Sequence, residues 1–304
     1  MTASPLTDRQ RISVAGGDDV IAAYLEQLER GAPPGVAAAR ALASSDVDWL
    51  SIRAEIVASP RAIILAERDG GPALAARCFD PGAPTAIHDH GAAGATLVVD
   101  GRQRYERFEP TGDGTARLES IHDLGVGDVV WWEEPPDDVH RQAGAGDGSI
   151  GLVLVAREPG HVTEFTDASP PDTALRAALL TGFLDGDVTR LTPWYDDDVL
   201  LDANVPEWRL QMRGRDDVLA GLEHEELAKP DHRLTFARDT DTTAGLLLET
   251  EMRFTDEGTG RRCRQAHHVR VRDGRIVEHV IWCTGVVDAD TAHRQLTTAP
   301  MERM

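Results

Sequence analysis

Between about residues 52 and 160, short apolar runs alternate with Gly, Pro and Asp turn formers at close spacing. Runs of this length suit strands and are too short for ordinary helices. Many short strands joined by tight turns predict a sandwich or barrel of antiparallel strands. The runs are Ala62–Ala66, Ala73–Cys78, Ala95–Val99, Gln103–Phe108, Val129–Trp132 and Ile150–Val155.

The segment ahead of these strands has helical spacing. Apolar residues recur from Val20 at intervals that share one helix face, and Asp18 or Asp19 can cap the start. Pro33-Pro34 interrupts the pattern, and a second helix is expected from Gly35 to Ala43. We therefore expect two helices before the barrel.

The second half of the chain restarts with a different order. Thr166 to Thr173 is rich in turn formers and predicts a linker. Helices are expected at Ala174–Asp185 and Arg215–Leu227, and Asp273-Gly274 predicts a tight hairpin. The expected strands are Arg233–Ala237, Thr243–Arg253, Arg262–Arg272 and Ile276–Cys283. Helices followed by a meandering sheet indicate an α+β domain. We expect two domains, at residues 1–165 and 172–300.

Charge and cysteine content restrict the possible partners. The 304 residues carry 31 basic and 52 acidic side chains, a net charge of −21, which disfavours nucleic acid and anionic membranes. Three scattered cysteines form no disulfide framework, which fits a reducing compartment. The polar N-terminus lacks the apolar core of a secretory signal, and no apolar run is long enough to span a membrane. A cytoplasmic protein acting on a small molecule is expected.

The strongest functional signal is the segment PTAIHDHG, residues 84–91. On a strand, His88 and His90 point to one face and Asp89 to the other. About fifty residues later, a Gly127-Asp128 turn, a strand and a Pro-Pro break lead to His140. A barrel can bring this third imidazole against the first two. A His-x-His pair alone is weak evidence, because exposed histidine pairs are common, but the combination is more specific and predicts a metal site.

This two-motif layout resembles the cupin (jelly-roll) barrel, and Arg53 to Gly160 resembles the cysteine dioxygenase-type thiol dioxygenases. The matching segments are PGAPTAIHDHG, LVVDGRQRYERFE and GDVVWWEEPPDDVHRQAG. Most cupins carry a Glu shortly after His-x-His, whereas Gly91 to Thr96 holds no carboxylate. The expected ligands are therefore three neutral imidazoles. Such a site can take an anionic thiolate together with O₂, and iron(II) can perform the redox step, although zinc would also bind well.

The resemblance implies roles for individual residues. His88, His90 and His140 match the family's iron ligands, and Arg61 matches the place of its carboxylate-binding arginine, although a solvated strand-end residue is an equal alternative. Two features depart from the family. The cysteine that some members carry after His-x-His is missing, and Gly151 to Val155 lacks the usual Ser-x-His-x-Tyr run. The second departure puts the substrate in question.

The segment Trp131-Trp132-Glu133 suggests one substrate. Strand alternation turns one tryptophan into the barrel, and aromatic faces with nearby carboxylates bind quaternary ammonium groups. A betaine-like thiol such as ergothioneine would fit, and Arg61 could hold its carboxylate. The alternative is that this tryptophan only fills the core.

Residues 172–300 resemble the SnoaL-like branch of the nuclear-transport-factor-2 (NTF2) fold, a cone-shaped α+β domain. The matching segments are LLTGFLDGDVTRLTPWYDDDVLLDANVPEW, GRDDVLAGL and HHVRVRDGRIVEHVIWCTG. Only one face of the last strand can line the cone, carrying either Glu278 and Trp282 or His279 and Cys283. The candidate polar residues are Asp196, Trp208, Arg213, His267, His268, Glu278, His279 and Trp282. This domain could provide acid–base catalysis, process the barrel's product, shape substrate access, or form a homodimer.

The leading hypothesis is therefore an iron(II) thiol dioxygenase that converts a small thiol and O₂ to a sulfinic acid. Two alternatives remain. The barrel could perform another cupin reaction, such as metal-dependent hydrolysis, isomerisation or dioxygenation of a different substrate. It could also be a non-catalytic sensor that binds a ligand while the second domain dimerises.

Overall fold

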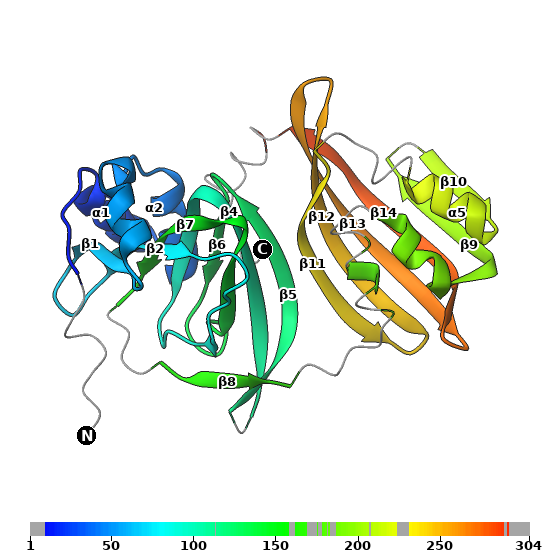
Figure 1. The fold of residues 1–304 in the computed structure, drawn as a ribbon, viewed down its shortest axis with the longest axis horizontal. Helices are drawn as coiled ribbons and strands as arrows, with labels where there is room; N and C mark the ends of the chain where they lie inside the picture. Colours follow the sequence, from blue (N-terminus) through cyan, green and yellow to red (C-terminus); the bar gives the residue numbers. More distant parts are fainter. Residues whose placement is uncertain are drawn as a thin grey trace. The chain divides into compact units, whose positions relative to one another are not determined.

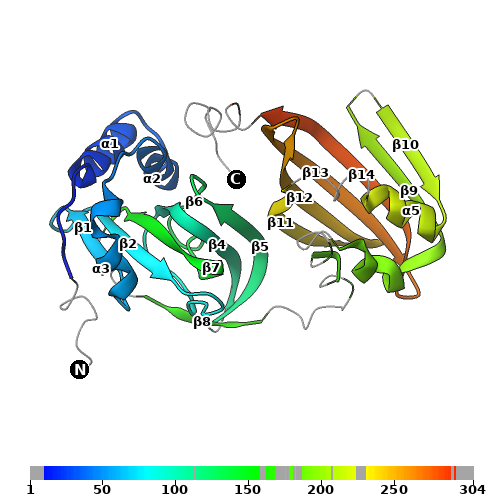
Figure 2. The ribbon, with the colours of Figure 1, turned by 45° about the horizontal axis from the view of Figure 1, so that its top comes forward.

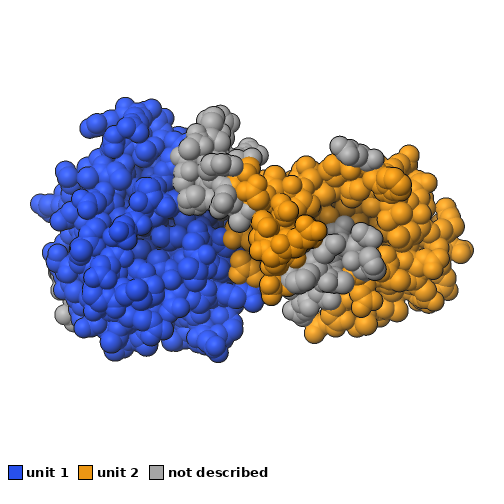
Figure 3. Space-filling view, turned by 90° about the horizontal axis from the view of Figure 1, so that it is seen from above, with its two compact units in different colours: residues 1–118, 123–168, 296–304 blue, residues 119–122, 169–295 orange. Residues whose placement is uncertain are grey.

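The computed structural model describes residues 10–112, 114–157, 162–168, 175, 178–180, 182, 187–206, 208–223, 231–288 and 291. The chain forms two compact units (Figure 3). The first contains residues 1–118, 123–168 and 296–304, and the second residues 119–122 and 169–295. Among the described residues, no helix is long and apolar enough to cross a membrane.

The first unit begins with helices on the outside of its strands. These are α1 (Gly17–Glu29), α2 (Pro34–Ala43), the 3₁₀ helix η1 (Trp49–Ile52) and α3 (Arg53–Ala58). Both long helices were predicted, although Gly16 rather than an aspartate stands at the N-cap of α1. Figure 2 shows α1 and α2 against the strands, and their apolar faces share one core with strands β1, β2 and β7.

The strands of the first unit close into a β-barrel (Figure 1). They are β1 (Ile63–Glu67), β2 (Ala73–Phe79), β3 (Ile87–His88), β4 (Gly94–Gly112), β5 (Thr115–Gly125), β6 (Val129–Trp132), β7 (His140–Val155) and β8 (Glu164–Asp167). Closure follows because β7 pairs with both β3 and β4, β4 with β5, β5 with β8, and β8 with β3.

The sequence predicted most of these strands and missed two. The runs expected at 95–99 and 103–108 belong to one long strand, β4. Strand β5 was missed because its apolar residues alternate with charged ones, and no continuous apolar run marks it. Strand β8 includes Thr166 and Asp167, so the expected linker starts too early. Closure depends on both missed strands.

The second unit is a curved sheet with α5 (Arg215–Leu222) packed on it. Its elements are η2 (Val188–Trp194), β9 (Tyr195–Val205), β10 (Trp208–Arg213), β11 (Arg233–Thr242), β12 (Gly245–Asp256), β13 (Thr259–Arg272) and β14 (Arg275–Asp288). The strand order is β11-β12-β13-β14-β9-β10, and only the β14–β9 pairing in this order is parallel.

The predicted hairpin between β13 and β14 is confirmed. Asp273 and Gly274 have φ values of 51° and 75°, the left-handed conformations that such a turn requires. Strands β9 and β10 were not predicted. The expected helix at Ala174–Asp185 lies largely outside the described residues, as does the end of the one expected at Arg215–Leu227.

Candidate metal centre

Three histidines meet at one end of the barrel. His88 on β3 pairs directly with His140 on β7, and His90 follows two residues after His88. The ring centroids lie 4.8–5.0 Å apart, and one ligand nitrogen from each ring lies within 4.8 Å of the others. No carboxylate joins this group among the described residues. The sequence prediction of this cluster is therefore confirmed, and a metal ion could be held there.

Hydrogen bonds orient two of the rings for metal binding. The Nδ1 of His88 is 2.8 Å from the carbonyl oxygen of Ala86, and the Nδ1 of His140 is 2.8 Å from that of Asp138. A carbonyl only accepts, so each Nδ1 carries the proton and each Nε2 keeps its lone pair. The Nε2 of His140 is fully buried and has no hydrogen-bond partner. A bound cation would satisfy this buried acceptor.

Burial keeps these imidazoles neutral. Desolvation lowers the pKa of His140 well below its usual value, and the neighbouring His90 and His88 lower it further. Desolvation also lowers the pKa of His88, where the bond to Ala86 opposes the shift and the charge of Arg77 adds to it. Neutral imidazole is the form that ligates a metal. His88 and His140 can therefore bind a cation at neutral pH without losing protons.

Asp138, which the sequence analysis overlooked, joins the two histidine motifs. Its Oδ2 accepts hydrogen bonds from the backbone N–H groups of His90 at 3.1 Å and Gly91 at 2.8 Å. Its own carbonyl accepts the bond from His140. One fully buried residue thus sets the backbone of one ligand and the ring of another. The only sequence signal was an acidic residue two positions before a histidine, which is too common to single out.

The structure does not bring Arg61 to the histidines. Its side chain is exposed after α3, and only its backbone forms hydrogen bonds, with Ser59. Arg77 lies nearer to His88, and it stands opposite Gly151 in the β2–β7 ladder. Its charge is close enough to lower the pKa of His88.

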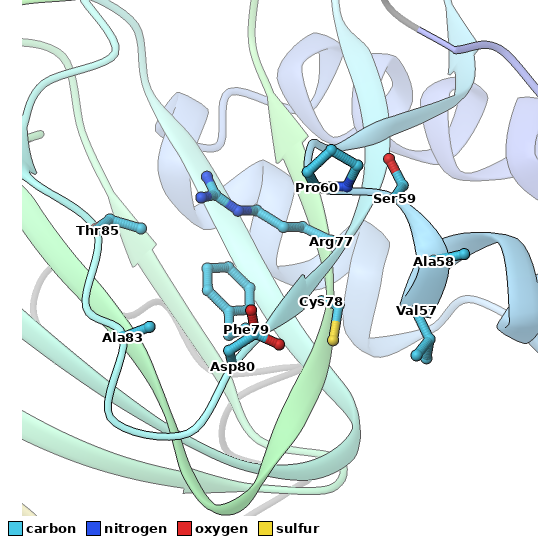
Figure 4. A pocket seen from close by; sticks show the side chains of 10 residues that line it. All are labelled: Val57, Ala58, Ser59, Pro60, Arg77, Cys78, Phe79, Asp80, Ala83 and Thr85. Atoms are coloured by element: carbon cyan, nitrogen blue, oxygen red, sulfur yellow. The ribbon is translucent and has the colours of Figure 1, made fainter.

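Arg77 lines a cavity of about 310 Å³ (Figure 4). Its guanidinium carbon lies 5.2 Å from the centre of the Phe79 ring, and burial lowers its pKa. In Figure 4 its side chain extends toward Thr85, while the sulfur of Cys78 points elsewhere. No carboxylate among the described residues pairs with this guanidinium. A half-buried cation in a cavity can bind an anionic ligand group.

The side chains of Trp131, Trp132 and Glu133 point to three different parts of the first unit. Trp131 packs with the helices in the outer core, whereas Trp132 turns inward, as alternation requires. The Trp132 ring is buried, and its centroid lies 5.4 Å from that of His90 and 6.3 Å from that of Tyr105. The carboxylate of Glu133 accepts hydrogen bonds from the backbone N–H groups of Gly35 and Val36 at the start of α2. The contacts of this segment fit the alternative in which the inward tryptophan fills the core.

Strand β7 lacks the Ser-x-His-x-Tyr run, and strand β4 supplies polar groups to the same interior instead. Tyr105 is fully buried and stacks on His140 with centroids 5.0 Å apart. On the same strand, Gln103 and Thr96 have buried polar atoms with no hydrogen-bond partner, and a Cβ added to Gly151 would lie 3.5 Å and 3.1 Å from their side-chain oxygens. The sequence showed what β7 lacks, but only the fold shows that β4 faces the same interior.

In the second unit, the inner face of β14 carries His279 rather than Glu278 and Trp282. A buried hydrogen-bond chain runs from the Tyr195 hydroxyl to His279 at 2.7 Å, from His279 to His267 at 3.0 Å, and from His267 to Thr250 at 3.1 Å. Burial lowers the pKa of His279 to about 3 and that of His267 well below its usual value. Because all four side chains are buried, this chain can position strands but does not offer an exposed acid or base.

The other second-domain candidates lie outside this inner face. Trp208 and Trp282 are 70% and 46% exposed. Glu278 pairs with Arg270 at 3.2 Å, and the carboxylate of Asp196 accepts a bond from the backbone of Asp198. The remaining two are His268, half-buried, and Arg213, exposed. Of the sequence candidates, the structure brings together only His267 and His279.

Comparison with known proteins identifies the second domain. Residues 177–279 match the model of the SnoaL-like domain, so this part of the chain contains a SnoaL-like, NTF2-like domain, as predicted. No curated protein matches the chain.

The chain is also similar to several solved structures. One is an NTF2-like protein of unknown function from Burkholderia xenovorans LB400, with 20% identity over 40% of this chain and 91% of that one, at a TM-score of 0.30. Another is an uncharacterised protein with a double-stranded β-helix domain from Klebsiella pneumoniae. It has 20% identity over 36% of this chain and 86% of that one, at a TM-score of 0.28. A third is a protein with a ketosteroid isomerase-like fold from Catenulispora acidiphila, in complex with trimethylamine. It has 14% identity over 36% of this chain and 84% of that one, at a TM-score of 0.31.

Proposed function

We propose that the first unit is a cupin (jelly-roll) thiol dioxygenase whose non-heme iron(II) is held by His88, His90 and His140. The observation that carries the proposal is the group of three imidazoles without a carboxylate, in which the buried Nε2 of His140 lacks a partner. Iron(II) in such a site supplies the redox chemistry by which both atoms of O₂ add to a thiolate sulfur, giving a sulfinate.

The protein's own residues would select and orient the thiol. Arg77 provides the positive charge for a substrate carboxylate, in place of Arg61, because it lines a cavity and its charge acts on His88. Trp132 and Tyr105 pack against the imidazoles and exclude water from one side of the site. Gln103 and Thr96 offer unpaired hydrogen-bonding atoms inside the barrel. The substrate class is therefore a small thiol that carries a carboxylate, and ergothioneine remains a candidate through that group.

The test begins with elemental analysis of the purified full-length protein and of His140→Ala. Iron-loaded protein is then screened for oxygen uptake with thiols, including ergothioneine and the pair cysteine and cysteamine, which differ only in the carboxylate. We expect oxygen uptake with formation of sulfinate, and a preference for the carboxylated member of the pair. Iron-loaded protein that consumes no oxygen with any thiol would refute the proposal.

Arg77→Gln and Arg61→Gln form a matched pair for the substrate contact. Loss of a charge-assisted contact costs about 1.5–3 kcal/mol, so Arg77→Gln should raise KM for a carboxylated thiol by about 10- to 100-fold. Metal content should not change. Arg61→Gln should behave like the wild type, because its side chain is exposed away from the histidines.

The two alternatives predict different outcomes in the same assays. A protein that retains zinc and turns over a substrate without consuming oxygen would be a cupin hydrolase or isomerase. Full metal occupancy and ligand binding without turnover would indicate a sensor.

A further inference from the structure

Two cysteines of the second unit lie side by side on neighbouring strands. The Sγ atoms of Cys263 on β13 and Cys283 on β14 are 3.1 Å apart. Regular pairing would not place them together, because Gln265 is the residue opposite Cys283. A bulge between Cys263 and Gln265, where Gly285 adopts φ 98°, bends β14 and brings the two sulfurs into contact.

The surroundings of Cys283 favour its thiolate. When Cys283 is the thiolate, the thiol of Cys263 can donate to its sulfur across 3.1 Å, and the backbone N–H of Gly285 donates to it at 3.4 Å, with a further contribution from the side chain of Gln265. These donors outweigh burial and lower the pKa of Cys283 to about 6. Cys283 is half-buried, whereas Cys263 is buried, so Cys283 is the more exposed residue of the pair.

We propose that Cys263 and Cys283 form a redox-active dithiol, in which Cys283 reacts first with a hydroperoxide and Cys263 then closes a disulfide. This inference does not depend on the function proposed for the barrel.

The reaction balances with hydrogen peroxide as the oxidant. The Cys283 thiolate attacks one peroxide oxygen, the O–O bond breaks, and the leaving hydroxide takes up a proton to become water. The sulfur of Cys263 then attacks the sulfenic sulfur of Cys283. The S–S bond forms, the S–O bond breaks, and the second hydroxide leaves as water with the proton of Cys263. Two thiols lose two electrons, and one peroxide becomes two waters.

The geometry requires little movement for this closure. The sulfurs must approach from 3.1 Å to about 2.0 Å, which small side-chain rotations can achieve. The resulting bond would tie β13 to β14 on the inner face that also carries Gln265 and His267. Oxidation would therefore stiffen this part of the sheet.

Cys78 provides a control within the same chain. It is also half-buried, but burial raises its pKa. At about pH 7, Cys283 has the larger thiolate fraction, which more than offsets the lower nucleophilicity of each thiolate, so Cys283 should be alkylated at least about threefold faster than Cys78. This comparison needs only the folded wild-type protein, with mass spectrometry of the alkylated peptides.

The decisive experiment treats the full-length protein with hydrogen peroxide, blocks the remaining thiols with iodoacetamide, and maps the peptides without reduction. We expect one intramolecular peptide pair joining Cys263 to Cys283, which dithiothreitol removes. Cys78→Ser should give the same product. Cys263→Ser should leave Cys283 as a sulfenic acid that dimedone traps, and Cys283→Ser should leave Cys263 unmodified.

Three results would overturn the proposal. The first is a wild-type protein in which Cys283 goes directly to sulfinic acid without forming the cross-link. The second is a cross-link that joins different molecules or uses Cys78. The third is a Cys283 that reacts no faster than Cys78.

Discussion

Acidification should destabilise the second unit through His267 and His279. Both imidazoles are buried and neutral, and they face Tyr195, Thr250 and each other, with His268 as a nearby charge. In the unfolded chain a histidine has a pKa of about 6.5, whereas in the fold that of His279 falls to about 3. Above about pH 6.5 neither state binds a proton at His279, so stability does not depend on it. Below that pH only the unfolded chain becomes protonated, so stability falls until the folded pKa is reached.

The expected loss follows from the size of the pKa shift. Each pH unit between the unfolded and folded pKa values costs about 1.4 kcal/mol per histidine. Between about pH 8 and pH 5, His279 alone should therefore lower the free energy of unfolding by about 2 kcal/mol. The pKa of His267 is lowered in the same direction, so its contribution adds to that of His279.

The assay is urea denaturation of the wild type and of His279→Gln, followed by circular dichroism across this pH range. The variant removes one titrating group. Its free energy of unfolding should therefore fall by about 2 kcal/mol less than that of the wild type between pH 8 and pH 5. The comparison cancels the histidines of the first unit, which titrate equally in both proteins. His268→Gln is a graded comparison, since it removes only the nearby charge that adds to the lowering of the His279 pKa, so its pH slope should change less than that of His279→Gln.

Equal pH slopes for the wild type and His279→Gln would refute this reasoning. Such a result would mean that His279 is already solvated in the fold, or that the buried chain accepts a proton without cost.

Four further substitutions test the first unit, with His122→Ala, from the segment assigned to the second unit, as a control. His140→Ala should abolish metal binding, measured by elemental analysis, while His122→Ala should retain it. Asp138→Asn should weaken metal affinity by about 10- to 100-fold in a chelator competition, because the backbone of His90 loses its carboxylate anchor. Glu133→Gln should lower unfolding free energy by about 1 kcal/mol through the start of α2, and an unchanged denaturation midpoint would contradict that role. Gly35→Ala should cost about 1–3 kcal/mol, because its Cβ would lie 2.4 Å from the Trp132 carbonyl oxygen.

Local patterns were sufficient for features that depend on neighbouring residues. Strand alternation placed His88 and His90 on one face, and a Pro-Pro break followed by His140 marked the start of β7. The same rule predicted that one of Trp131 and Trp132 would face inward. The loose SnoaL-like pattern in the second half was also sufficient to identify its domain.

Features that depend on distant strands could not be predicted in this way. Arg61 was chosen by its position along the chain, but Arg77 lies nearer to His88, opposite Gly151 in the β2–β7 ladder. Glu133 looked like a substrate ligand until α2 brought two unpaired N–H groups to it. Asp138 matters only because closure places the His90 loop beside it.

By itself, the sequence determined which side chains share a face, because this follows from the two-residue period of a strand, and where many strands turn, because Gly, Pro and Asp mark the turns. The tertiary structure decided which face is inside, which arginine is near the histidines, and which cysteines touch. These depend on strand order, register and one bulge, which are set by contacts between residues far apart in the chain.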